Sequence, residues 1–248
     1  MSDDPEIRAA EAGERLEGWR GILTRADAAS TTDETIAELL GSASVATMAE
    51  IESFMRDLVE SITSAINNEG CAVSSLRPEL RVLHAYRTFD SIRNLEMRNN
   101  KYWQSRIDLA RLHASSEIAS LPERSRNRPQ APLRGSTIAL RDISEVATIF
   151  GFPHPSQLTE NGLQVTSLKK MVEYRNAYAH AEASPIEIFP NPRRELRNVL
   201  KYIAHIFDLL NVLAKNWKTV LTERLYLTST ALQHISVIQH DTSQPIKS

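Results

Sequence analysis

The sequence is poor in residues that cross-link or interrupt a chain. Its 248 residues include one cysteine, Cys71, and only eight glycines. A single cysteine excludes an intramolecular disulfide and a zinc site built from several cysteines, and it is typical of a reducing compartment. We therefore expect a cytoplasmic protein.

Long apolar runs are missing as well. No stretch approaches the roughly 20 consecutive apolar residues that a membrane helix needs. The first residues, 1–6, are acidic, whereas a signal peptide begins with basic residues. The sequence thus predicts neither a membrane anchor nor an export signal.

What the chain does contain favours an all-α fold. Hydrophobic residues make up 42% of it and charged residues 24%, which is enough for a globular core. Alternating β-branched runs are few, and Leu, Ala, Glu and Arg are plentiful. Apolar residues at helical spacing predict helical segments over 5–28, 31–67, 78–95, 103–118, 142–150, 168–181 and 191–232.

Local signals mark several of these boundaries. Thr31 and Glu34 form a capping-box pattern, and Gly41 is a point where the long second helix could break. Asn191 followed by Pro192 suits the start of the last helix. We expect an N-terminal helical arm, a main helical domain, an inserted basic loop and a disordered tail, over residues 1–30, 31–235, 122–135 and 236–248.

Charge is segregated along the chain. Acidic residues dominate up to Glu60, and arginines dominate the middle, although the formal net charge is only -2. An RNA could follow the basic middle, and four arginines of the predicted loop are the candidates for RNA binding: Arg124, Arg126, Arg128 and Arg134. Alternatively, these arginines pair with the acidic N-terminal part on solvated surfaces.

The most informative segment is 168–182. It places Arg175, Asn176 and His180 within two turns of one predicted helix. A guanidinium can stabilise a phosphorane, and an imidazole that titrates near neutrality can move the proton of a ribose hydroxyl. Arginine followed by histidine at such spacing is common by chance, and the pairs in 77–84 and 106–113 also satisfy it.

The context of this segment separates it from those chance pairs. Arg175-Asn176-Ala-Tyr-Ala179-His180 resembles the signature of the HEPN superfamily, Arg-Asn followed by three residues and His near a helix end. The stretch 46–54 resembles the first core helix of that superfamily, so the resemblance spans about residues 35–217. The closest similarity is to the RiboL-PSP-HEPN and related stand-alone prokaryotic HEPN branches. It implies an antiparallel helical bundle, here with an added N-terminal helix and a long C-terminal helix.

The resemblance also implies an activity. HEPN nucleases cleave RNA without a metal or other cofactor, so His180 would move protons, Arg175 would stabilise the phosphorane and Asn176 would orient the phosphate or the histidine. Two subunits would join their sites, which implies a homodimer through the Arg175–His180 face. Glu52 and Tyr178 are possible supporting residues. A toxin or antiphage defence role, with RNA as substrate and an antitoxin or defence protein as a further partner, fits this branch.

Plainer interpretations stay open. Arg175 could pair with Glu173 or Glu182, and His180 could cap its helix. Glu52 could be a surface ion-pair residue. The whole chain could be a non-catalytic HEPN-like module that binds nucleotide or protein, or an antitoxin or adaptor. Most relatives place Gly after the histidine, where this chain has Ala181, so the geometry of that turn is open.

Overall fold

The computed structural model describes residues 4–93, 101–125, 130–135, 137–153, 162–181 and 183–229. Its described part contains nine α-helices and no strand, and two isolated β-bridges join Ala72 to Ile118 and Leu76 to Leu227. The predicted all-α class is therefore confirmed. The predicted tail 236–248 lies outside the described residues. Within the described ranges, no helix combines the length and the apolar character that a bilayer crossing requires.

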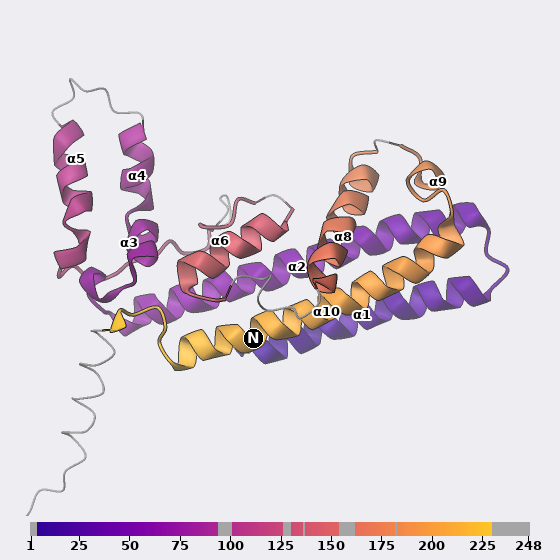
Figure 1. The fold of residues 1–248 in the computed structure, drawn as a ribbon, viewed down its shortest axis with the longest axis horizontal. Helices are drawn as coiled ribbons and strands as arrows, with labels where there is room; N and C mark the ends of the chain where they lie inside the picture. The colour runs from indigo at the N-terminus through magenta and orange to yellow at the C-terminus, as the bar shows by residue number, and fades with distance from the viewer. Residues whose placement is uncertain are drawn as a thin grey trace, which may run out of the picture.

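Three long helices form the body of the molecule (Figure 1). They are α1 (Pro5–Ala28), α2 (Asp33–Glu69) and α10 (Pro192–Thr222), and each packs against the other two. α1 runs antiparallel to α2, whereas α10 runs in the direction of α2 (Figure 1). Helix α1, the predicted arm, buries Leu16 and Leu23 in the same core as the other two.

The ends of these helices follow from local chemistry, with small shifts from the predictions. Thr32, one residue after the predicted cap, accepts a hydrogen bond from the Thr35 N–H at 3.3 Å and starts α2. α2 passes through Gly41 without a break. α10 begins at Pro192 as predicted, but it ends ten residues early at Thr222, and Arg224 just beyond it has a left-handed φ of 53°.

A helical hairpin projects from one end of the body (Figure 1). It contains α3 (Pro78–His84), α4 (Tyr86–Arg93) and α5 (Lys101–Ala110). The predicted helix over 78–95 is broken at Ala85, and the predicted helix over 103–118 ends at Ala110. On this hairpin the Trp103 side chain is 65% exposed.

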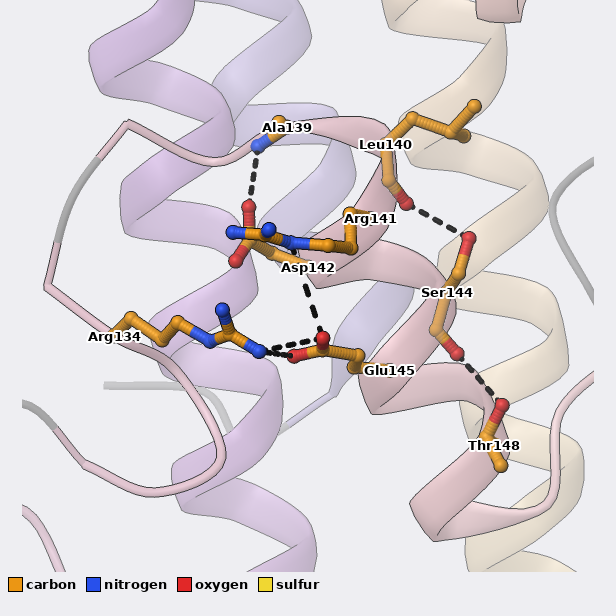
Figure 2. A network of polar contacts seen from close by, with 8 residues as sticks. All are labelled: Arg134, Ala139, Leu140, Arg141, Asp142, Ser144, Glu145 and Thr148. Atoms are coloured by element: carbon orange, nitrogen blue, oxygen red, sulfur yellow. Dashed lines mark hydrogen bonds and ion pairs between the residues drawn. The ribbon is translucent and has the colours of Figure 1, made fainter.

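Helix α6 (Leu140–Phe150) lies against the side of the body, where a polar network fixes its start (Figure 2). Asp142 accepts a hydrogen bond from the Ala139 N–H at 2.9 Å, and Gly151 ends the helix with a left-handed φ of 87°. Helix α8 (Leu163–Ala179) starts five residues before the predicted Leu168 and packs against both α2 and α10. The short α9 (Pro185–Ile188) follows it.

Candidate active site on helix α8

Helix α8 is held in place by one face. Ser167, Leu168 and Met171 on that face are buried, and the Ser167 hydroxyl lies 2.8 Å from Nδ1 of His205 on α10. One turn further on, the Tyr174 hydroxyl donates to Glu195 of α10 at 2.8 Å. Burial and this bond raise the pKa of Tyr174 well above its ordinary value. These contacts bind the first four turns of α8 to α10.

The last turn of α8 rests on α2 instead. The Tyr178 hydroxyl donates to Glu38 at 2.8 Å and lies 3.5 Å from the Ser42 hydroxyl. The ring covers Gly41 so closely that a Cβ built at Gly41 would lie 2.2 Å from it. Only glycine therefore fits this contact, which explains a glycine in the middle of a long helix.

Arg175 is half-buried beside this contact. Its Nη1 donates to Oδ1 of Asn176 at 3.2 Å. No carboxylate among the described residues lies within ion-pair distance of Arg175. Glu173 pairs with Lys170 at 2.6 Å, and Glu182 lies outside the described residues. The alternative of an ion pair with Glu173 is thus not found. The charge of Arg175 is not neutralised by an acid within this described set.

His180 ends the helix and is exposed to solvent. Its backbone N–H donates to the Asn176 carbonyl at 3.0 Å, whereas no hydrogen bond of its ring is present in the described part of the chain. The next residue, Ala181, has a φ of 50°, in the left-handed region that favours glycine. The chain therefore makes here, with alanine, a turn that glycine adopts more easily, at the cost of some backbone strain.

The arrangement combines three chemically different groups at one helix end. The guanidinium of Arg175 can bind an anion, and the amide of Asn176 holds it through one oxygen. The exposed imidazole of His180 can exchange protons with a bound molecule. One chain supplies each group once.

Two supporting residues predicted from the sequence have other contacts. Glu52 pairs with Arg56 one turn along α2, at 3.1 Å, so within a single chain its carboxylate is engaged away from α8. The Tyr178 hydroxyl is bound to Glu38, and its role in the chain is to seat the last turn of α8. Glu38 and Gly41 of α2 make this contact with Tyr178. The only feature of the sequence that could have indicated it is an isolated glycine inside an amphipathic helix.

The loop arginines predicted to bind RNA are already engaged where they are described. Arg124 pairs with Glu60 at 3.1 Å and Asp57 at 3.8 Å, and both acids belong to α2. Arg134 donates to both oxygens of Glu145 at 2.6 and 2.8 Å (Figure 2). Arg126 and Arg128 lie outside the described residues. Arg124 thus matches the alternative of an arginine paired with the acidic N-terminal part, whereas Arg134 is paired with an acid of α6 instead.

Comparison with known proteins adds one finding. The family model described as RiboL-PSP-HEPN matches residues 20–216. This range runs from within α1 to near the end of α10 and includes all of α8. No curated protein and no solved structure matches the chain.

Proposed function

The chain belongs to the RiboL-PSP-HEPN family, and on this premise we propose that it is a metal-independent endoribonuclease that acts as a homodimer. HEPN domains include ribonucleases and nucleotide-binding modules. The choice between these two rests on the residues at the end of α8. The proposal extends to a cytoplasmic toxin or antiphage defence effector, in keeping with the family.

One observation carries the proposal. Arg175 has an amide partner but no acidic partner among the described residues, and His180 one turn later exposes its ring to solvent. A structural arginine is usually neutralised by an acid, and a capping histidine usually binds helix carbonyls. Both groups are therefore available to a phosphodiester.

The proposed reaction uses the substrate's own nucleophile. His180 takes the proton of the ribose 2'-OH, whose oxygen attacks the adjacent phosphorus, while Arg175 stabilises the negative charge of the phosphorane. The bond to the 5'-oxygen then breaks, and a histidine returns a proton to that oxygen. The products are a 2',3'-cyclic phosphate and a 5'-OH. Asn176 fixes the guanidinium through the 3.2 Å bond.

A dimer supplies what one chain lacks. The end of α8 offers a single imidazole per chain, that of His180, whereas the reaction needs a base for the attack and an acid for the leaving group. An isologous contact would place two copies of His180 and Arg175 around one phosphate. We propose that the exposed end of α8 forms this contact.

The test is cleavage of labelled RNA by the purified protein in EDTA. Wild type should produce fragments with 2',3'-cyclic phosphate ends, and Arg175→Ala and His180→Ala should not. Equal inertness of all three proteins would favour the alternative of a non-catalytic HEPN-like module. Full activity of His180→Ala would remove the histidine from the mechanism.

A further inference from the structure

The first three turns of α10 carry an exposed row of positive charge. Arg193, Arg194, Arg197 and Lys201 are all exposed there. Arg193 is neutralised, because it pairs with Asp33 at 3.3 Å and Asp27 at 3.9 Å and donates to the Thr31 carbonyl at 2.8 Å. The other three have no acidic partner among the described residues.

These three residues lie on one side of the helix. Arg194, Arg197 and Lys201 are three and four residues apart, which makes them surface neighbours spaced about 4.5 and 6 Å along the axis. Like charges at this spacing destabilise a helix rather than support it. The acid that lies among them in sequence, Glu195, accepts hydrogen bonds from Tyr174 and Asn198. Helix stability therefore does not explain the row, which we call the cationic row.

The cationic row borders the helix that carries the candidate site. Glu195 and His205 of α10 face α8, where they bind Tyr174 and Ser167. Arg194 lies about 100° around the helix from Glu195 but only about 20° from His205, so it lies at the edge of the α8 contact. The short α9 lies between the end of α8 and the start of α10 (Figure 1).

The helix that carries the cationic row exposes no large hydrophobic side chain within its described residues. Large exposed hydrophobic side chains occur elsewhere in the described chain, and none of them is on α10: Ile7, Ile22, Val82, Phe89, Trp103, Ile107, Ile118, Leu163 and Ile186. The centre of a protein interface is usually apolar and depleted of charge. Regularly spaced cations on a helix face without large exposed hydrophobic side chains instead suit a phosphate backbone.

We propose that Arg194, Arg197 and Lys201 bind consecutive phosphates of a single-stranded RNA whose scissile linkage lies at the end of α8. The choice of RNA as ligand rests on the proposed function. The row replaces the loop arginines Arg124 and Arg134 as the expected RNA contact, because those two are ion-paired.

Binding can be measured apart from cleavage. A fluorescent 2'-O-methyl RNA has no 2'-OH to attack, so its anisotropy reports binding by the full chain whether or not the chain is a nuclease. Arg194→Ala/Arg197→Ala/Lys201→Ala should weaken binding at least tenfold near 100 mM salt. It should also reduce the slope of log affinity against log salt by about 2, since each lost phosphate contact on a single strand contributes about 0.7.

A charge-matched control separates the cationic row from net charge. Arg124→Ala/Arg134→Ala/Arg193→Ala removes the same number of positive charges, but each is ion-paired in the folded chain. This variant should bind within about twofold of wild type because its arginines have acidic partners. Arg194→Lys/Arg197→Lys should keep most of the affinity, and thermal melting verifies that every variant folds.

The outcomes distinguish this inference from the proposed function. Equal binding by the row variant and wild type would overturn the inference, as would equal losses in both triple variants or no binding by wild type at low salt. Unchanged RNA binding with loss of self-association would identify a protein interface instead. Binding that depends on the row in a chain that never cleaves RNA would support the inference while the nuclease assignment fails.

Discussion

Two arginine-bearing corners of the molecule differ in how completely their polar groups are satisfied. Beside α6, Arg134 binds both oxygens of Glu145, Arg141 lies 3.9 Å from the same carboxylate, and Asp142 caps the helix (Figure 2). At the end of α8, Arg175 has one amide partner. The ring of His180 has no partner in the described chain.

The polar groups beside α6 hold the fold together, whereas those at the end of α8 are free to contact another molecule. The α6 corner uses its charges to hold a loop on a helix, so little remains for another molecule. The α8 end is held through Tyr178 and Gly41, which are not part of the motif, and its charged groups remain accessible. The residues that hold the end of α8 in place are thus different from the proposed catalytic residues.

The largest expected effect is a difference in RNA cleavage rate between variants of Arg175 and Arg134. Arg175→Ala should lower the rate of RNA cleavage by about 10²–10³, the usual cost of one transition-state donor, while Arg134→Ala stays within about twofold. Single-turnover cleavage of labelled RNA measures both rates. Comparable losses in the two variants would remove the distinction between the corners.

Substitutions at two helical glycines test the contact between α8 and α2 at Gly41. Gly41→Ala should lower the free energy of unfolding by about 1–3 kcal/mol, because the new Cβ meets the Tyr178 ring. Gly18→Ala in α1, where nothing lies within 4 Å, should raise it by about 0.5–1 kcal/mol. Urea unfolding gives both values, and a neutral result at Gly41 would show that Tyr178 does not seat the helix there.

A third pair of variants should change stability and cleavage independently of each other. Asp142→Ala removes the acceptor of the Ala139 N–H and should cost about 1 kcal/mol of stability without a change in cleavage rate. Asn176→Ala should cost under about 0.5 kcal/mol because its site is half-exposed, yet slow cleavage about tenfold through the freed guanidinium. Urea unfolding and cleavage kinetics are measured on the same preparations of both variants. Loss of stability and of cleavage rate together in either variant would contradict the prediction.

The smallest effect concerns the turn after His180. Ala181→Gly should stabilise the fold by about 0.5–1 kcal/mol, since Ala181 has a φ of 50°. Ala179→Gly, two residues earlier in the same helix, should destabilise it by a similar amount. Melting temperatures that move in opposite directions would confirm the turn, and a loss in both would indicate a different backbone there.

The sequence predicted features that local chemistry decides. The start of α10 at Pro192 and the end of α6 at Gly151 depend on neighbouring residues, and both were predicted. The break at Ala85 was missed because helical spacing continues across it. The pairing of Arg124 was left open, since its partners are more than sixty residues away and only the folded chain brings them together.

In the site, too, residues that are close in sequence could be predicted and contacts between distant residues could not. The motif gave Arg175, Asn176 and His180 because they share one helix. Glu38 and Gly41 lie on α2, about 140 residues away from Tyr178, and no spacing rule could link them. The positions of the catalytic candidates in a dimer stay a prediction.

Tryptophan fluorescence can report on two parts of the molecule separately. Trp103 is 65% exposed on the projecting hairpin, whereas Trp217 is 1% exposed and stacks on Phe152 with ring centroids 4.8 Å apart. A water-soluble collisional quencher will reach the first indole and not the second. In a Trp19→Phe variant, which removes the third and partly buried tryptophan on α1, emission can therefore be resolved into a component from the hairpin and a component from the interior. Either component can be followed without attaching a dye.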